Sequence, residues 1–421
     1  MESSPRVVIT GIGVVSPIGI GATAYWDAMC QMRSGVVSLE SDATRGMPLS
    51  IGGAIPNFDG KDYVKPRKAL KVMSREIQTG FSAASMAIEA AGLGPGQLPP
   101  DRSGVVFGSE MLYCEPEDMV AVHNRCIQDG EFHFSQWGPS FGSEMYPLWM
   151  LMYLPNMTAC HIAIAQDARG PNNTICQGEA SSLLALVEAA SIIRRGHADV
   201  MICGGSSSRL SITPMLYRGV ERLARRIETP SAACRPFDAE RDGMVNGEGA
   251  AAFILEREEF AVARGARILA RITGWGVTFG SREPAPRNHQ AAIERSMQQA
   301  LRTSDLNPVD IGHVNAHASG TLEDDPWEAQ AIRSVLGDVP VTAPKSFFGN
   351  IGSGGGAVEL VAGVLALQHG LVPPTLNYET PDPACPVRVV AKGPLSGRPA
   401  TALVLSQSGT GQAACVALGG A

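Results

Sequence analysis

The sequence is poor in charged and aromatic residues, which make up 18% and 6% of its 421 positions. It has no long basic run, and its formal net charge of −7 argues against a surface that binds nucleic acid. No apolar stretch is long enough to span a membrane, and the first residues lack the basic and apolar regions of a signal peptide. These absences predict a cytoplasmic protein that binds neither nucleic acid nor membrane.

Signals for metal sites and disulfides are also missing. The nine cysteines form no CxxC pair and do not have the spacing of metal ligands, and their number is odd. The eight histidines form no HExxH or HxH cluster. We therefore expect reduced thiols and no metal site.

The length and the order of the predicted elements favour two similar halves. A chain of 421 residues with 44% hydrophobic residues is too long for one ordinary core. Apolar patterning predicts alternating strands and helices, and hence a layered α/β fold with mainly parallel sheets. We expect an N-terminal half over 1–255 and a C-terminal half over 256–421. The predicted strands are 6–19, 103–109, 173–175, 198–205, 247–256, 267–276, 311–316 and a final one at 401–407; the predicted helices are 21–33, 75–92, 178–196, 288–303, 325–336 and 356–369.

The segment 171–205 contains a helix that is apolar around most of its surface and is therefore predicted to be buried. It is predicted to begin near Gly178 and to end at Gly196, which can adopt the left-handed conformation after the last turn. Glu179 falls in the predicted first turn. Unpaired N–H groups there favour a thiolate, an oxyanion or a carboxylate.

This segment resembles the nucleophile segment of β-ketoacyl synthases, and residues 6–19 and 235–250 are similar to further signatures of that family. The resemblance spans nearly the whole chain. It implies a thiolase-like fold, in which two βαβαβαβαβ halves form five layers, α-β-α-β-α. An ungapped match through Arg194–Gly205 runs back to Glu179, which stands where the family has its nucleophilic cysteine. Cys176, three residues earlier, is interpreted as an ordinary buried cysteine.

The resemblance also implies further catalytic residues. Synthases of this type use a Cys-His-His arrangement, and residues 314–321 match the first histidine motif at His317. Residues 344–352 match the second motif, but Asn350 stands in place of its histidine. Lys345 and Glu328 correspond to a buried polar network of the family. An asparagine can still donate a hydrogen bond to an oxyanion.

Two more motifs imply substrate binding. Ser319 and Thr321 occupy positions whose hydroxyls hold the phosphopantetheine arm of an acyl carrier protein. Residues 406–414, which include Gly409 and Thr410, resemble the glycine-rich oxyanion loop of the family, but both phenylalanines of that loop are missing. We expect no cofactor, since the phosphopantetheine arm acts as the substrate carrier.

Residues 110–155 form a longer segment than in typical synthases and are rich in aromatic and methionine side chains. In the family this region builds the dimer interface and part of the neighbour's acyl pocket, and plain core packing is the alternative. The residues expected at the tunnel or interface are Trp149, Met150, Met152 and Tyr153.

Two arginine-containing segments have a functional and a structural interpretation. Helical spacing of Arg218, Arg222, Arg225 and Arg226 would gather a patch on which an acidic carrier protein could dock. A solvated helix face is the alternative. The loop 235–250 is expected to shape the surroundings of the active site through a structural role.

These replacements favour a subunit that has kept the fold and lost condensation. A carboxylate is a poor acyl acceptor, because the resulting mixed anhydride is more reactive than the thioester. The sequence thus resembles a chain length factor, a subunit that pairs with a cysteine-bearing ketosynthase in polyketide or fatty-acid-like biosynthesis and shapes the acyl tunnel. Such subunits usually carry glutamine at the position of Glu179. Although the family is one of acyltransferases, we expect no condensation by the chain alone.

Two alternatives remain open. The first is a homodimeric malonyl-carrier decarboxylase or atypical 3-oxoacyl synthase. A carboxylate ~4 Å from the malonyl carboxylate would oppose it by about 4 kcal/mol at an effective dielectric constant near 20, unless Glu179 is protonated. The second is a non-catalytic acyl-binding scaffold that homodimerises.

Overall fold

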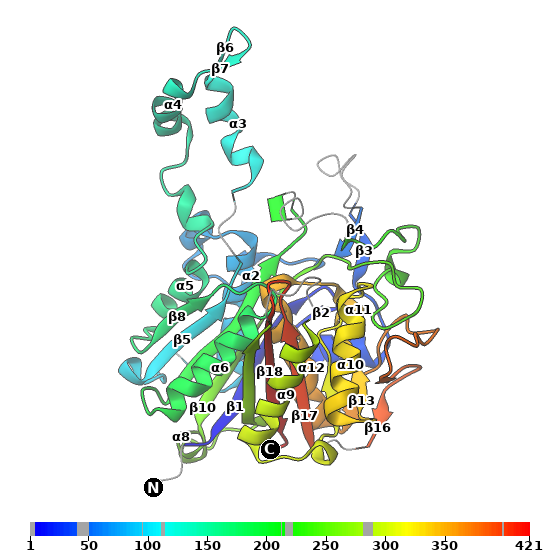
Figure 1. The fold of residues 1–421 in the computed structure, drawn as a ribbon. Helices are drawn as coiled ribbons and strands as arrows, with labels where there is room; N and C mark the ends of the chain where they lie inside the picture. The colour runs from blue at the N-terminus through cyan, green and yellow to red at the C-terminus, as the bar shows by residue number, and fades with distance from the viewer. Residues whose placement is uncertain are drawn as a thin grey trace.

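The computed structural model describes residues 5–39, 50–94, 96–110, 114–211, 213–214, 222–280, 289–397 and 400–421. Its strands and helices alternate along the chain (Figure 1). The N-terminal elements are β1 (Val7–Ser16), β2 (Gly19–Ile20), α1 (Ala22–Cys30), β3 (Val36–Ser38), β4 (Ile51–Gly53), α2 (Arg75–Ala90), β5 (Ser103–Gly108), α3 (Pro116–Arg125), β6 (Ile127–Gln128), β7 (Glu131–Phe132), α4 (Trp137–Glu144), α5 (Met157–Gln166), β8 (Asn172–Ile175), α6 (Ser181–Arg194), β9 (Val200–Ser208) and β10 (Glu248–Arg257). The later elements are α8 (Glu258–Ala263), β11 (Ala270–Phe279), α9 (Gln290–Ser304), β12 (His313–Asn315), α10 (Asp324–Leu336), β13 (Pro340–Thr342), α11 (Lys345–Phe348), α12 (Gly355–His369), β14 (Leu371–Val372), β15 (Arg388–Val389), β16 (Leu395–Ser396), β17 (Thr401–Gln407) and β18 (Gln412–Gly419).

The two halves repeat one sheet topology. In the first half the strand order is β8-β5-β9-β10-β1, and in the second it is β13-β12-β17-β18-β11, with β15 added at the edge. In both, the outer strands pair in parallel and the last two pairings are antiparallel. Residues 7–9 of β1 pair with 270–272 of β11, so the two halves are also joined by backbone hydrogen bonds.

Helices cover both faces of each half and make the five layers of a thiolase-like fold. α6 and α12 lie between the two halves, with α6 against β5 and β9 and α12 against β17. α2 and α5 cover the outer face of the first half, and α9 and α10 cover that of the second. The predicted fold class is therefore confirmed. The expected boundary after residue 255 falls inside β10 and stays a prediction.

The expectation of mainly parallel sheets is wrong, and so is that of a final strand at 401–407. β17 matches that strand, but the chain then turns through residues 408–411 and returns as the antiparallel strand β18. A short turn can join only antiparallel neighbours. The sequence of β18, QAACVALG, is made mostly of small residues with weak strand preference, which explains why the pattern missed it.

Close packing of backbones positions β1 against α2. All ten residues of β1 are buried. A Cβ atom on Gly13 would lie 1.9 Å from the carbonyl oxygen of Ala83 in α2, and one on Gly11 would lie 2.1 Å from that of Ala87. Only glycine allows this helix to lie so near the strand.

Residues 114–156 form an arm that projects from the body of the molecule (Figure 1). The hydroxyl of Tyr153 donates a hydrogen bond to the Asp118 carboxylate at its base. Neighbouring rings along the arm have centroids 5.8–6.5 Å apart, in the series Phe132, Trp137, Phe141, Trp149 and Tyr153.

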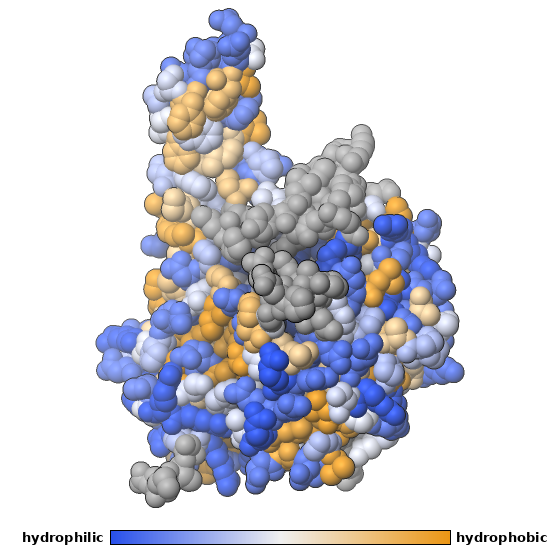
Figure 2. Space-filling model, viewed as in Figure 1, coloured by the Kyte–Doolittle hydropathy of each residue, from blue (hydrophilic) through white to orange (hydrophobic). Residues whose placement is uncertain are grey.

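The arm also exposes apolar side chains to solvent in the single chain, and Figure 2 shows them gathered on its surface. Tyr146 and Met150 are exposed, while Trp137, Trp149, Met152 and Tyr153 are half-buried. The alternative of plain core packing for this segment is therefore wrong. Among the described residues, no helix combines the length and apolar character needed to cross a membrane.

Candidate functional site

The segment before α6 places Glu179 next to the N-terminus of that helix. Gly178 has a φ of +57°, and Gln177 and Glu179 form a bridge, so the chain turns sharply here. The helix begins at Ser181, which puts Glu179 just before the first turn rather than in it as expected. The hydroxyl of Ser406, in β17, donates a hydrogen bond of 2.9 Å to the Glu179 carbonyl oxygen. Gly196 has a φ of +75°, as expected after the last turn.

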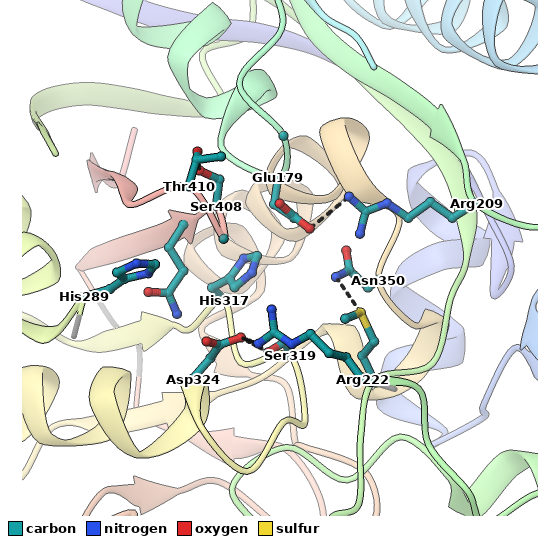
Figure 3. Close-up of a pocket in the computed structure, with 14 residues that line it drawn as sticks. Glu179, Arg209, Arg222, His289, His317, Ser319, Asp324, Asn350, Ser408 and Thr410 are labelled. Atoms are coloured by element: carbon teal, nitrogen blue, oxygen red, sulfur yellow. Dashed lines mark hydrogen bonds and ion pairs between the residues drawn. The ribbon is translucent and has the colours of Figure 1, made fainter. Parts of the chain in front are cut away.

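Glu179 faces a cavity of about 400 Å³ that brings together residues from both halves (Figure 3). Of the predicted site residues, Glu179, His317, Asn350, Ser319, Gly409 and Thr410 line it. The other lining residues are Gly178, Arg209, Arg222, Met244, His289, Asp324, Gln407 and Ser408. Gln407 and Ser408 belong to the expected oxyanion loop, Met244 to the loop 235–250 and Arg222 to the expected arginine patch. No sequence motif assigned Arg209, His289 or Asp324 to the site.

The Glu179 carboxylate forms an ion pair with Arg209, a partner that the sequence analysis missed. Nη2 of Arg209 lies 2.9 Å from Glu179 Oε1 and 3.3 Å from Glu110 Oε1. The Arg209 side chain is 2% exposed, and that of Glu179 is 13% exposed. A buried carboxylate requires a cation or several donors, and this requirement is the one signal that could have led to Arg209.

His317 is held between the cavity and a buried polar network. The backbone N–H groups of His317 and Ala318 each donate a 2.7 Å hydrogen bond to the Glu328 carboxylate. Lys345 Nζ lies 3.3 Å from His317 Nδ1 and forms a buried ion pair with Glu359. Lys345 thus contacts His317 without lining the cavity itself.

Burial and charge keep the His317 ring neutral. Burial lowers the pKa of His317 well below its usual value, the Lys345 charge lowers it further, and Glu179 opposes the shift. A neutral imidazole can accept or donate a hydrogen bond, whereas an imidazolium can only donate. His317 is therefore suited to hydrogen bonding with a bound carbonyl group or oxyanion.

Asn350 lines the cavity together with His317 (Figure 3). Its Oδ1 accepts a 3.0 Å hydrogen bond from the Gly352 N–H, and Nδ2 lies 3.6 Å from the sulfur of Met244. The amide Nδ2 is thus the atom available to donate toward a ligand. This arrangement matches the expected donor role, which stays a prediction.

The loop between β17 and β18 lines the cavity with polar groups where the family has phenylalanines. Ser408 and Thr410 bond to each other through their hydroxyls at 2.7 Å. Met244 is the only large apolar side chain among the described lining residues. The residues expected at the tunnel or interface, Trp149, Met150, Met152 and Tyr153, lie on the arm and do not line this cavity, so the single chain does not bring them to the site.

Three expectations about neighbouring residues need correction or restriction. Cys176 is exposed in the single chain rather than buried, because it follows the edge strand β8. Partial desolvation of its sulfur, with Glu110 and Glu76 nearby, raises the pKa of the thiol to about 11, so it stays protonated at neutral pH.

The expected arginine patch does not form on a helix. Arg218 lies outside the described residues. Arg222, Arg225 and Arg226 do not share a helix face, because residues 223–227 are not helical.

The loop 235–250 combines a buried ionic network with one contact to the cavity. The Asp238 carboxylate accepts 2.7 Å hydrogen bonds from the N–H groups of Glu379 and Thr380. Arg241 pairs with Asp382 at 2.6 Å. These bonds agree with the structural role expected for the loop. Met244 is the residue of this loop that lines the cavity.

The sequence matches two family models along its length. The first is described as "Beta-ketoacyl synthase, N-terminal domain" and covers residues 4–261. The second is described as "Beta-ketoacyl synthase, C-terminal domain" and covers residues 269–379.

Similar curated proteins include enzymes of two pathways. The 3-oxoacyl-[acyl-carrier-protein] synthase 2 of Synechocystis sp. is 33% identical over 390 residues, which are 90% of this chain and 89% of that protein. The tetracenomycin polyketide synthase ketoacyl synthase alpha subunit of Streptomyces glaucescens is 33% identical over 394 residues, 91% of this chain and 90% of that protein.

Solved structures with the same fold include the ishigamide ketosynthase/chain length factor, with a TM-score of 0.85 and 27% identity over the full length of both chains. A type II polyketide ketosynthase bound to the hexaketide, in complex with its acyl-carrier protein, has a TM-score of 0.85 and 28% identity, also over the full length of both chains. A β-ketoacyl synthase from Burkholderia phymatum has a TM-score of 0.86 and 26% identity, covering 99% of this chain and 100% of that one.

Proposed function

The chain belongs to the β-ketoacyl synthase family, and from this premise we propose that it is a non-condensing subunit of the chain length factor type. In this role it pairs with a cysteine-bearing ketosynthase in polyketide or fatty-acid-like biosynthesis and shapes the acyl tunnel. The observation that carries the proposal is the ion pair between Glu179 and buried Arg209 at the position of the family's nucleophile.

The ion pair argues against covalent catalysis by Glu179. An acyl group transferred to a carboxylate forms a mixed anhydride, which is less stable than the thioester it came from. Arg209 further stabilises the ionised carboxylate relative to any acylated form, because acylation removes the negative charge that the guanidinium contacts. No cysteine lines the described part of the cavity, and the protonated Cys176 lies outside it.

Two surfaces support pairing with a second subunit of the same fold. β8 is the last strand of its sheet, and its residues are exposed or half-buried. Such an edge leaves backbone N–H and C=O groups available for another strand. The arm beside it exposes large apolar side chains, which include Phe132, Phe134 and Leu148. The likeness to a ketosynthase/chain length factor pair favours a ketosynthase as the partner.

A second candidate function is decarboxylation of a malonyl-carrier by a homodimer. The observation in its favour is that His317 and Asn350 still face an open cavity of about 400 Å³. Arg209 also offsets part of the repulsion that Glu179 would exert on a malonyl carboxylate. Glu110, however, shares the same guanidinium, so two carboxyl groups face one cation.

Turnover by the purified chain alone separates these functions. With malonyl-carrier and acyl-carrier supplied together, we expect neither a β-ketoacyl product nor release of carbon dioxide above the background. Release of carbon dioxide would favour the decarboxylase. Loss of that release in both Glu179→Ala and Glu179→Gln would then assign a catalytic role to the carboxylate. Absence of turnover together with failure to bind any ketosynthase would favour a homodimeric scaffold.

A further inference from the structure

A second ion pair, between Arg222 and Asp324, crosses the cavity on the side away from Glu179. Figure 3 shows His317 between this pair and the pair of Glu179 with Arg209. Nη2 of Arg222 contacts Asp324 Oδ2. The Arg222 side chain is 36% exposed and that of Asp324 is 20% exposed, so this side of the cavity is close to solvent.

Arg222 also lines a neighbouring hollow of about 240 Å³. This hollow is lined by Arg225, Asp242, Gly243, Thr321, Leu322 and Glu323, and Arg222 lines both spaces. A movement of the Arg222 side chain away from Asp324 would therefore change the walls of both spaces.

Asp324 also engages the two hydroxyls assigned to carrier-arm binding. Ser319 Oγ donates to the Asp324 carboxylate at 3.4 Å, and the Asp324 N–H donates to Thr321 Oγ1 at 3.1 Å. The two hydroxyls bond to each other at 3.2 Å. Asp324 thus contacts Arg222 and Ser319, which line the cavity, and Thr321, which lines the neighbouring hollow.

These three groups suit a phosphate as well as they suit a carboxylate. A guanidinium binds either anion with paired hydrogen bonds, and hydroxyls can donate to either one. A partly exposed ion pair contributes only about 0–1 kcal/mol to stability. The free energy needed for an incoming phosphate to displace Asp324 from Arg222 is therefore small. The carboxylate of Asp324 occupies the place that such an anion would take.

We propose that the Arg222–Asp324 pair is an exchangeable contact that a phosphopantetheine arm must open. The phosphate replaces the Asp324 carboxylate as the partner of the Arg222 guanidinium. The hydroxyls of Ser319 and Thr321 then become available to the amide groups of the arm. Arg222 is then a phosphate-binding residue, and Asp324 is its internal competitor. This inference rests on the proposed function, because it assumes that the cavity receives an arm from a carrier protein or from coenzyme A.

Binding of small probes to the full-length chain tests the exchange. Isothermal titration calorimetry would compare phosphopantetheine with pantetheine, which lacks the phosphate. In the unsubstituted protein, phosphopantetheine binds more tightly. Asp324→Asn increases its affinity about two- to fivefold, as expected from loss of a competing partly exposed ion pair. Arg222→Gln lowers its affinity to that of pantetheine. Arg333→Gln is the matched control, because Arg333 forms an exposed pair with Asp338 and does not line the cavity, and it changes neither affinity.

The outcomes separate failure of the exchange from failure of the proposed function. Equal phosphopantetheine affinity in the unsubstituted protein and in Asp324→Asn overturns the exchange, and so does a phosphate preference that survives Arg222→Gln. If the chain still binds a phosphopantetheinylated carrier protein, the carrier-related function stands. If neither that carrier protein nor coenzyme A nor phosphopantetheine binds any variant, both proposals fail. Tighter binding of the carrier protein than of coenzyme A identifies the carrier as the source of the arm, and the reverse order identifies coenzyme A.

Discussion

At the scale of single residues, the ion pair between Glu179 and Arg209 is largely buried, so the stability of each side chain depends on the other. Replacing Arg209 with methionine would leave the carboxyl groups of Glu179 and Glu110 without their shared cation. Loss of one partner from a buried ion pair lowers the free energy of unfolding by about 3–5 kcal/mol. We expect a loss of this size for Arg209→Met in urea denaturation.

The control for this prediction is Arg226→Gln, whose partly exposed pair with Glu240 should contribute less than about 1 kcal/mol. The double variant Glu179→Gln with Arg209→Met should recover part of the loss, because it removes the charge of one of the two carboxylates that lose their contact with Arg209. A change below about 1 kcal/mol in Arg209→Met would contradict the coupling.

Glu328 makes stability depend on pH. Burial raises the pKa of its carboxyl to about 8, although the N–H groups of Ala318 and His317 oppose the shift. Between pH 4.5 and 8 the folded protein therefore holds a proton that the unfolded chain has released. Stability falls as pH rises through this window and levels off above about 8.

We expect the free energy of unfolding to decrease by about 1 kcal/mol or more from pH 6.5 to 8. Burial also raises the pKa of Glu76 to about 8, so Glu76 contributes in the same direction. Glu328→Gln resembles the protonated form and should show a flatter dependence. Urea denaturation at pH 6.5, 7.3 and 8.0 measures the slope, and an equal slope in the variant would contradict the assignment to Glu328.

The sequence located residues that lie within recognisable motifs but not the partners that reach them from elsewhere. His317, Asn350 and Thr410 were found because neighbouring residues match local patterns. Arg209 and Asp324 had no such pattern, and Arg222 was indicated only through a helical patch that the structure does not form, since each acquires its role from a contact across the fold. Arg222 and Asp324 are 102 positions apart in the chain.

At the scale of elements, the distance between β1 and α2 depends on glycine. A Cβ on Gly13 would clash with the backbone of Ala83, and neither buried element can shift freely. We expect Gly13→Ala to lower the free energy of unfolding by about 1–3 kcal/mol or more, as measured by denaturation. Gly138→Ala in α4 is the control. A Cβ there meets no atom within 4 Å, and alanine favours a helix by up to about 1 kcal/mol. Equal stability of both variants would contradict the packing argument.

Helices and strands with strong apolar patterns were predictable from the sequence, whereas pairing direction was not. α6 and α12 are buried on most of their surface, and the apolar pattern of α6 indicated its burial. The antiparallel strand β18 was missed because small residues carry little periodic signal. The turn at Gly178 leaves Glu179 outside the helix, which begins at Ser181 instead of near Gly178, a displacement of three residues that periodicity does not resolve.

At the scale of the whole molecule, the exposed apolar residues of the arm are unusual for a chain that functions alone. Phe134 is 76% exposed and Met150 is 46% exposed. We expect the double variant Phe134→Ser with Met150→Ser to weaken association with the partner at least tenfold, because buried aromatic anchors dominate interfaces. Its free energy of unfolding as a single chain should change by less than about 1 kcal/mol.

Sedimentation equilibrium at several concentrations measures that association. Val309→Ser is the matched control, since Val309 is 90% exposed and lies outside the arm. Association that is unchanged in the double variant would exclude these two side chains from the interface. The sequence indicated the arm through its length and composition but not its projection from the body, because no local pattern predicts contacts such as that between Tyr153 and Asp118, which lie 35 positions apart.

The most direct test of the account is the composition of the complex that the chain forms. The chain would be co-expressed with a candidate cysteine-bearing ketosynthase, purified through a tag on one subunit only, and weighed by native mass spectrometry. The account predicts a one-to-one heterodimer. A stable homodimer of this chain that excludes the ketosynthase would contradict it.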